Sequence, residues 1–254
     1  MKHYKTLVFD LDGTLAVSKS PLSPEMAKTF SKASQTCNLA VITGGMFEQI
    51  QEQVIDQLTA DAILSNIFIL PTSGSEMRLY NSETKEWGIV YSKKLSSEQR
   101  MRISRSLEEA LETSSVDIGS EEILGEQIED RESQITFSAL GQKQTPELKA
   151  VWDPEELKRR EIMSHLAGLD DEFDVKLGGT TSIDITLKGI DKEFGINEFF
   201  KHTGFDMKEA LFIGDKIIPG GNDWAATRTE VETMSTTGPD ETMHIIRENL
   251  NSQD

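Results

Sequence analysis

Short, uninterrupted apolar runs recur in the first part of the chain and again near its end. They cover Thr6–Phe9, Leu39–Ile42, Ile67–Leu70 and Ala210–Ile213. Apolar runs of this length without alternation are typical of parallel strands that are buried on both faces. Helical patterns lie between them: Ser23 and Pro24 suit an N-cap and a first helical position, and Phe47–Leu58 has an apolar face. This order of strands and helices predicts a Rossmann-like, doubly wound α/β sheet.

The middle of the chain has a different pattern. Met77–Tyr80 and Trp87–Tyr91 flank a polar turn and predict a hairpin or meander, while Ser133–Ala139 and Thr181–Leu187 alternate as half-exposed strands do. Helices are predicted over Ser97–Glu112, Glu155–Leu169 and Lys192–His202. Antiparallel strands and helices between two α/β segments predict an inserted α+β domain. We expect this domain to span residues 81–187, with residues 1–80 and 188–254 forming the core.

Composition narrows the class of protein. The chain has 254 residues, of which 37% are hydrophobic and 28% charged, as in a globular and not a disordered protein. Its formal net charge of −18 argues against nucleic-acid and anionic-membrane partners. Acids interrupt the first apolar run and no run is long enough to cross a membrane, so we expect a cytoplasmic protein. The single cysteine, Cys37, rules out an intramolecular disulfide.

The strongest chemical signal is the segment from Asp10 to Leu15, DLDGTL, directly after the first apolar run. Two carboxylates at the end of a buried strand are costly unless a cation compensates them. In the turn after the strand, Asp10 can face a reacting phosphorus while Asp12 reaches the leaving oxygen. Gly13 allows the backbone to turn close to a ligand. The alternative is a turn that merely ends the strand.

This segment resembles the nucleophile loop of the haloacid dehalogenase (HAD) superfamily. The resemblance implies that Asp10 attacks phosphorus to give an aspartyl phosphate, and that Asp12 protonates the leaving group and activates the incoming hydroxyl or water. Thr43, which follows the second run, resembles the residue that binds the transferring phosphoryl group. Lys192 resembles the lysine that stabilises its charge. Asp215 resembles the metal-binding acid, with Asn222 and Asp223 as support.

Electrostatics explains why such a site needs a metal ion. A carboxylate 4 Å from a phosphate charge costs about 4 kcal/mol at an effective dielectric constant of about 20. Mg²⁺ held by Asp10, the Asp12 carbonyl and Asp215, with Lys192 beside it, would remove this repulsion. Because the pattern supplies only oxygen ligands, Mg²⁺ is favoured over zinc as the cofactor.

A closer resemblance covers most of the chain. The segments GDKIIPGGND, FEQIQEQV, GGTTSIDI and EDRESQITFSALG are similar to segments of the α-phosphomannomutases of the HAD superfamily, which carry an inserted C2b cap domain. The resemblance implies that residues 81–187 are a cap for substrate recognition. It implies that Arg131 binds the distal phosphate and that Ser182 and Asp184 contact the sugar. Three further substrate-binding positions of that family, all arginines there, fall on Lys19, Gln142 and Lys149, and Gly44 lies beside Thr43 in the phosphoryl loop.

These departures affect the expected activity. Replacing an arginine with Gln142 removes a charged hydrogen bond of about 1.5–3 kcal/mol and weakens the grip on a second phosphate. We therefore expect a phosphosugar phosphatase, with a phosphomannomutase that interconverts mannose 1-phosphate and mannose 6-phosphate as the alternative. A non-catalytic sugar-phosphate sensor is a remote third. The amphipathic helix over Ser97–Glu112 would face either solvent or the cap of a second copy in a homodimer.

Overall fold

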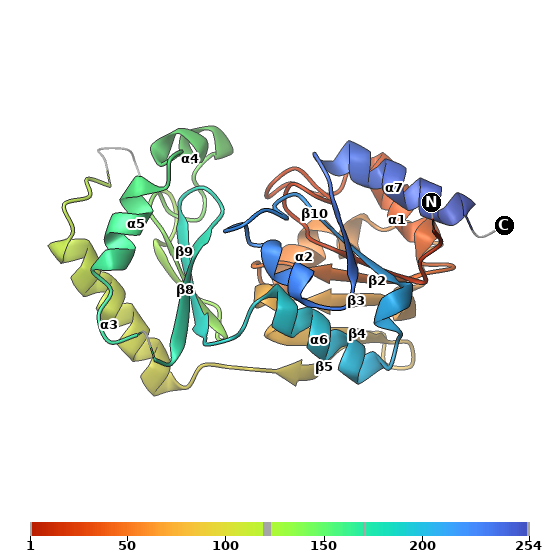
Figure 1. Ribbon diagram of the computed structural model, residues 1–254, viewed down its shortest axis with the longest axis horizontal. Coiled ribbons are helices and arrows are strands. Elements are labelled where there is room, and N and C mark those ends of the chain that lie inside the picture. Colours follow the sequence, from red (N-terminus) through yellow and green to blue (C-terminus); the bar gives the residue numbers. More distant parts are fainter. Residues whose placement is uncertain (1, 119–122, 170, 253–254) are drawn as a thin grey trace. The chain divides into compact units, whose positions relative to one another are not determined.

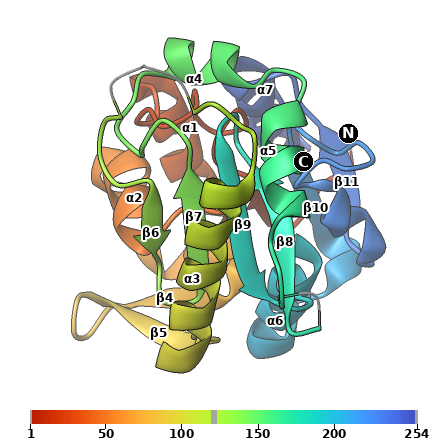
Figure 2. The ribbon, with the colours of Figure 1, turned by 90° about the vertical axis from the view of Figure 1, so that its left-hand side faces the viewer.

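The computed structural model describes residues 2–118, 123–169 and 171–252 (Figures 1 and 2). The chain divides into two compact units, the first of Met1–Ser92 and Asp191–Asp254 and the second of Lys93–Ile190. The first boundary lies further along the chain than the predicted Asn81. The structure groups the following residues with the first unit because the strand that ends at Ser92 pairs with the strand before it.

A seven-stranded sheet forms the centre of the first unit, in the order β11-β10-β1-β2-β3-β4-β5. The strands from β11 to β3 are parallel, and β4 and β5 continue the sheet as an antiparallel hairpin. The strands are β1 (Thr6–Phe9), β2 (Asn38–Ile42), β3 (Ile67–Leu70), β4 (Glu76–Asn81), β5 (Glu86–Ser92), β10 (Ala210–Gly214) and β11 (Glu232–Ser235). The doubly wound α/β class predicted from the apolar runs is confirmed.

Helices cover both faces of this sheet, which is why its parallel strands are apolar throughout. Alternate residues of β1 point to opposite sides: Leu7 and Phe9 lie in one core with Phe30 of α1, whereas Val8 lies in another with Phe199 of α6. The helices are α1 (Pro24–Ala33), α2 (Phe47–Gln53), α6 (Lys192–Thr203) and α7 (Pro239–Asn251), with short 3-10 helices η1 (Ile55–Gln57), η2 (Leu64–Asn66), η3 (Thr72–Gly74), η4 (Met207–Glu209) and η5 (Trp224–Arg228).

The sheet has a topological switch point between β1 and β10, where the order of successive strands reverses direction. From β1 the chain proceeds through β2 to β3 on one side, and β10 and β11 lie on the other. Ligands of open α/β sheets bind at the carboxyl ends of the strands at such a point, because the connecting loops diverge there. Asp10 follows β1, and Asp215 follows β10. The topology therefore brings these two acids, far apart in sequence, to one edge of the sheet.

The second unit is an antiparallel sheet with helices on one face. Its four strands have the order β6-β7-β9-β8, and Figure 2 shows α3 and α5 lying across them. Ile135 of β7 and Ile183 of β9 form the core with residues of both helices. The elements are α3 (Ser97–Thr113), β6 (Ile128–Asp130), β7 (Gln134–Ser138), α4 (Pro146–Trp152), α5 (Leu157–Ser164), β8 (Phe173–Gly178) and β9 (Ser182–Leu187).

Two predictions for this unit need correction. The strand predicted to be half exposed, β7, is buried along its whole length, and its polar residues Gln134 and Thr136 are buried with the apolar ones. The helix predicted over Glu155–Leu169 is shorter: α5 begins at Leu157, after Glu156 in the left-handed region, and ends at Ser164. Among the helices of the described residues, none combines the length and apolarity that crossing a membrane requires.

The first unit also differs in detail from the sequence analysis. The helix predicted over Phe47–Leu58 ends at Gln53, where Val54 caps it before the short turn of η1. The N-cap at Ser23 is as predicted, and its hydroxyl accepts a hydrogen bond from the Met26 amide at 3.2 Å. The edge strand β11 and the helix α7 were not predicted. β11 has a single apolar residue, Met234, and so shows no apolar run, and the buried face of α7 combines Ile245 and Ile246 with the polar residues Thr242 and Asn249.

A close backbone contact joins η3 to α6. The Cα atoms of Gly74 and Gly195 face each other so closely that a Cβ built on Gly195 would lie 2.8 Å from the Gly74 Cα. The same Cβ would lie 2.6 Å from Cδ1 of Ile42. Because α6 carries Lys192 at its first turn, this contact fixes that lysine relative to the ends of β2 and β3.

We predict that Gly195→Ala lowers the free energy of unfolding by about 1–3 kcal/mol, because overpacking outweighs the better helix propensity of alanine. Gly88→Ala is the matched control, since its added Cβ would meet no atom nearer than 3.9 Å. Urea unfolding followed by circular dichroism measures both variants. Equal stability of Gly195→Ala and the wild-type protein would contradict the assigned contact.

Candidate active site

Three carboxylates and one ammonium group meet at the carboxyl ends of β1 and β10. Ligand oxygens of Asp10, Asp215 and Asp223 all lie within 4.8 Å of one another. The Lys192 Nζ contacts Oδ1 of Asp10 and Oδ1 of Asp223. Asp10, Asp223 and Lys192 are each at most 3% exposed. These four residues, which the sequence predicts to share one site, lie together in the structure.

The cluster carries more negative than positive charge. Burial raises the pKa of Asp10, an effect that Lys192 opposes and Asp223 reinforces. The pKa of Asp215 is raised in the same way, by burial and then by Asp223. For Lys192, burial alone would lower the pKa, but the neighbouring Asp10 and Asp223 outweigh it and raise the pKa above its usual range. Lys192 therefore stays charged, and the site still attracts a further cation.

Two glycines make room for the acids. A Cβ on Gly13 would lie 2.7 Å from Oδ2 of Asp215, and a Cβ on Gly214 would lie 2.5 Å from Oδ2 of Asp223. Gly13 also has a φ of +84°, a backbone conformation that side chains disfavour. Backbone and carboxylates are thus packed without space for any larger residue at these two positions.

Asp12 is held by the loop that follows it. Its Oδ1 accepts a hydrogen bond of 2.6 Å from the backbone amide of Lys19, which has a positive φ of 58°. The Lys19 side chain itself is exposed. Thr14, within the same loop, donates from Oγ1 to Oδ2 of Asp10 at 3.4 Å. Thr14 was not among the predicted site residues, although its place in the motif, four residues after Asp10, was a usable signal.

The loop after β2 forms a second wall of the site. Thr43 is 3% exposed, and its Oγ1 accepts a hydrogen bond from the amide of Gly45 at 3.3 Å, with Gly44 between them. Thr72 and Ser73 hold this loop through their amides, which donate to the Gly45 and Thr43 carbonyls at 2.8 Å each. Both have positive φ values, 46° and 58°, which are uncommon for non-glycine residues.

The supporting residues have distinct positions. Both carboxylate oxygens of Asp223 already accept hydrogen bonds, Oδ1 from Lys192 and Oδ2 from the backbone amide of Lys216 at 2.9 Å. This geometry suits a residue that orients the cluster. Asn222 is exposed in the preceding turn, and no hydrogen bond joins its side chain to the acids among the described residues. Asp10 and Asp215 are the better candidates for direct metal ligands.

In the second unit, the predicted residues Arg131 and Asp184 share a polar network on the sheet. Oδ1 of Asp184 accepts from Thr136 Oγ1 at 2.7 Å, and Thr136 accepts from Gln134 Nε2 at 2.8 Å. Arg131 is ion-paired with Glu129 at 2.6 Å. Burial raises the pKa of Asp184, and the nearby Arg131 and the bonds from Thr136 and Gln134 oppose this shift.

Ser182 lies two residues before Asp184 on β9, whereas Gln142 follows β7 in a turn and Lys149 belongs to α4. Ser182 is paired with Ser138 across β9 and β7, and the turn after Ser138 leads to Gln142. Lys149 is 5% exposed, and its Nζ donates to the Gln142 carbonyl at 2.9 Å. Thr136 and Gln134 were not predicted as site residues. Their polar character at alternate positions of a buried strand was the signal, and the sequence analysis took it to mean solvent exposure.

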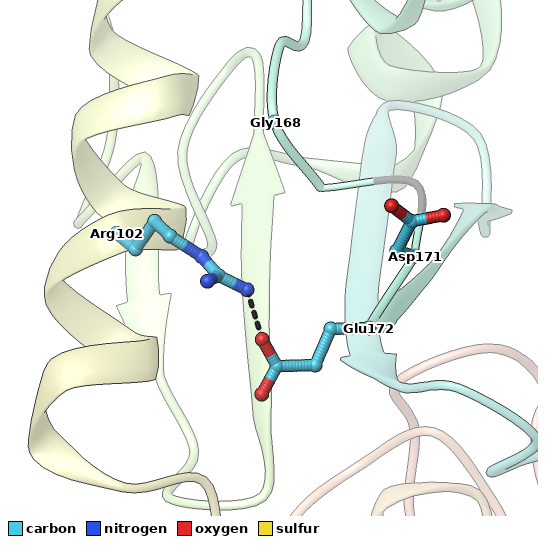
Figure 3. A pocket seen from close by; sticks show the side chains of 4 residues that line it. All are labelled: Arg102, Gly168, Asp171 and Glu172. Atoms are coloured by element: carbon cyan, nitrogen blue, oxygen red, sulfur yellow. Dashed lines mark hydrogen bonds and ion pairs between the residues drawn. The ribbon is translucent and has the colours of Figure 1, made fainter.

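A separate cavity of about 230 Å³ in the second unit is lined by Arg102, Gly168, Asp171 and Glu172 (Figure 3). Its one lining arginine is ion-paired with Glu172, and its guanidinium also lies over the Phe173 ring at 4.7 Å. With two acids beside an arginine that is already paired, the cavity is a poor site for a phosphate. None of the predicted site residues lines it.

Comparison with known proteins defines the class. The family of haloacid dehalogenase-like hydrolases matches residues 7–223, which include both acids of the first loop and all three acids of the cluster. The chain belongs to this family. It is therefore an enzyme of the phosphatase and phosphomutase type.

Individual relatives extend over nearly the whole chain. A probable phosphomannomutase of Caenorhabditis elegans is 28% identical over 257 residues, covering 98% of this chain and 96% of that protein. The phosphomannomutases of Drosophila melanogaster and Saccharomyces cerevisiae are 28% and 27% identical and cover 96% and 97% of this chain. Among solved structures, a truncated Plasmodium falciparum IMP-nucleotidase has a TM-score of 0.68 at 19% identity, covering 99% of this chain and 71% of that one. A Thermoplasma acidophilum protein has a TM-score of 0.59 at 18% identity, covering 96% and 90%. These structures share the fold.

We predict opposite effects on stability for two substitutions in the cluster. Lys192→Met should lower the free energy of unfolding by about 3–5 kcal/mol at neutral pH, because it leaves buried carboxylates without their cation.

Asp215→Asn should raise the free energy of unfolding when a chelator keeps metal ions away from the cluster. The pKa of Asp215 is raised in the folded state, so its ionised form destabilises the fold once the pH exceeds the ordinary aspartate value of about 3.9.

Chemical unfolding between pH 4 and pH 8, near the ordinary pKa of aspartate and well above it, measures both effects. The advantage of Asp215→Asn should grow as the pH rises from the acidic end of that range. A destabilising Asp215→Asn substitution at neutral pH without metal would contradict the excess negative charge assigned to the cluster.

Proposed function

We propose that the protein is a Mg²⁺-dependent phosphotransferase that moves a phosphoryl group between positions of a phosphorylated hexose of the mannose type, through a phosphoaspartate at Asp10. The observation that carries this proposal is the Asp10 carboxylate, held at the end of β1 by Lys192, with Asp12 two residues further on. The near full-length relatives are named phosphomannomutases, which supports the mutase over the phosphatase that the sequence analysis placed first.

The first half of the reaction uses both loop acids. In a mutase, an oxygen of Asp10 attacks one phosphorus of a hexose bisphosphate, and the bond from that phosphorus to the sugar oxygen breaks, which leaves a hexose monophosphate. In a phosphatase, the same step acts on a hexose monophosphate. Asp12 donates a proton to that leaving oxygen, so the sugar departs as a neutral hydroxyl. Lys192 would stabilise the negative charge of the phosphoryl group, and Thr43, in the loop after β2, would bind its oxygens.

In the second half, Asp12 removes a proton from an incoming hydroxyl, which attacks the phosphorus and frees Asp10. A mutase uses a hydroxyl at another position of a sugar phosphate, and a phosphatase uses water. The outcome depends on how firmly the sugar with its second phosphate is bound while the phosphoaspartate exists. In the second unit, Arg131 would bind that phosphate, and Ser182 and Asp184 would bind sugar hydroxyls.

The residues at the cluster fit Mg²⁺. All the donors are carboxylate or carbonyl oxygens, which Mg²⁺ prefers. The single positive charge of Lys192 does not balance the three carboxylates. Gly13 and Gly214 have no side chain, which lets Asp215 and Asp223 pack against the backbone at these positions. Asp10, the Asp12 carbonyl and Asp215 would hold the ion, with Asp223 orienting the group. When bound, Mg²⁺ would offset the charge of the phosphoryl group.

Phosphatase activity is the second candidate, and one observation favours it. Two positions that are arginines in the family are Gln142 and Lys149 here, and Lys149 is buried with its ammonium group on the Gln142 carbonyl. An ammonium held in this way offers a phosphate a single point charge, where an arginine offers two parallel hydrogen bonds. If the second phosphate is bound more weakly, the sugar phosphate dissociates more often, and water then hydrolyses the phosphoaspartate more often.

We predict that Asp10→Asn abolishes turnover of mannose 1-phosphate, because an amide does not act as the nucleophile. Asp56→Asn, an exposed aspartate in η1, should leave turnover unchanged. Phosphorus NMR of mannose 1-phosphate, mannose 6-phosphate and free phosphate follows both reactions at once. Chelation should remove the activity and added Mg²⁺ should restore it. Turnover that persists in Asp10→Asn would rule out the proposed nucleophile.

We also predict that Gln142→Arg raises the ratio of isomerised sugar phosphate to released phosphate, by about tenfold if one charged hydrogen bond is regained. Lys143→Arg is the matched control, since Lys143 is an exposed neighbour that is already cationic. The same NMR measurement gives the ratio. No change for Gln142→Arg would contradict the role given to this position.

A further inference from the structure

Arg159 is unusual among the charged residues of the second unit. It has the largest side chain among the fully buried residues of the described chain, at 2% exposure, and its ion-pair partner Asp153 is 4% exposed. Burying two charges in a small domain costs several kcal/mol per ion, and apolar residues of the same size are often at least as stable. General stability therefore does not explain the pair, and a need for fixed geometry is the better explanation.

The contacts of Arg159 are directional and use its whole guanidinium. Nε donates to Oδ2 of Asp153 at 2.8 Å, and Nη1 donates to the carbonyls of Gly178 at 3.3 Å and Gly179 at 3.1 Å. Nη2 donates to the Asp153 carbonyl at 3.4 Å. The Asp153 carboxylate also accepts the amides of Lys158 and Arg159 at 3.0 and 3.1 Å. These bonds outweigh the effect of burial and lower the pKa of Asp153.

Gly178 ends β8 and Gly179 begins the turn into β9, the strand that carries the predicted sugar-binding residues. Gly178 is paired with Ser182, the first residue of β9. Arg159 reaches the turn from α5, which packs on the apolar face of the sheet with Ile162. Asp184 extends from the polar face, where Thr136 donates to it.

The Asp184 carboxylate lies directly on Gly178. A Cβ added to Gly178 would overlap Oδ2 of Asp184. Gly178 is therefore fixed by Arg159 through its carbonyl and lies in contact with Asp184 through its Cα. A shift of this turn would move the surface on which the carboxylate rests and the start of the strand that carries Ser182.

We propose that Arg159, oriented by Asp153, is a positioning residue that fixes the Gly178–Gly179 turn and thereby sets the positions of Ser182 and Asp184 for sugar binding. The inference rests on the proposed function, since it assigns the sugar to these two side chains. Arg159 touches neither sugar nor phosphate. Its loss should therefore weaken sugar-phosphate binding and leave the phosphoryl transfer at Asp10 intact.

Two variants test this without relying on one fold-sensitive substitution. Arg159→Lys keeps the positive charge beside Asp153 but lacks the guanidinium group, whose Nη1 donates to the carbonyls of Gly178 and Gly179. The double substitution Arg159→Met with Asp153→Leu removes both charges, a change that often preserves stability. Arg160→Met is the control, because Arg160 is the next residue of the same helix, is largely exposed and pairs with Glu156 at 2.5 Å.

Steady-state kinetics with mannose 1-phosphate and amide hydrogen exchange of the 178–184 segment are the readouts. Both Arg159 variants should raise KM about tenfold or more, as expected for lost binding of one well-placed polar group, with kcat changed less than about threefold. Exchange of the 178–184 amides should become faster in both variants. Arg160→Met should match the wild-type protein in all three quantities.

An unchanged KM, unchanged exchange in this segment, or equal losses in kcat and kcat/KM would overturn the inference, the last because it indicates general damage. These outcomes leave the proposed function standing, since the wild-type enzyme is active in each. A wild-type protein that turns over no hexose phosphate would instead refute the proposed function, and the inference with it.

Discussion

The structure depends on one electrostatic constraint: buried carboxylates at the carboxyl ends of two neighbouring parallel strands share one lysine. Asp10 and Asp223 both contact Lys192, and burial, reinforced by the nearby Asp223, raises the pKa of Asp215. A fold selected for stability alone would avoid this arrangement, because it places like charges together away from water. Under the proposed function, the arrangement would bring a phosphorylated anion, together with a cation, to a carboxylate nucleophile. The topology of the sheet, the two glycines that admit the acids and the close contact behind α6 all serve to hold it.

The second unit holds the candidate binding residue Asp184 in place by hydrogen bonds between polar side chains. Its sheet is apolar toward the helices, and the opposite face carries Thr136 and Asp184 in a chain of hydrogen bonds. Hydrogen bonds fix side-chain direction in a way that apolar packing does not, since their strength falls steeply with angle. Recognition of a sugar by hydroxyl groups needs such fixed directions. Under the proposed function, the second unit would determine which sugar phosphate binds, and the first unit would carry out the phosphoryl transfer.

The sequence predicted the parts of the fold that depend on local patterns. The continuous apolar strands and the N-cap at Ser23 were read correctly, because burial on both faces and helix capping leave local signatures. The four residues of the ionic cluster were found from a motif and a resemblance. Thr14 and Thr136 were missed although their positions in the motif and in the alternating strand were signals, because neither position names the carboxylate that the threonine contacts in the folded chain. The burial of β7 was misjudged for a related reason: alternation of polar residues reports two different faces, and it does not report that one of them faces water.

The most direct test of the account is to trap the covalent intermediate. The protein would be mixed with a sugar phosphate and Mg²⁺, quenched in acid and digested, and the peptide that contains Asp10 would be analysed by mass spectrometry. The account predicts that this peptide gains the mass of one phosphoryl group, located on Asp10 and absent without Mg²⁺. Phosphate found on another residue, or turnover with no phosphorylated protein at any time before completion, would contradict it.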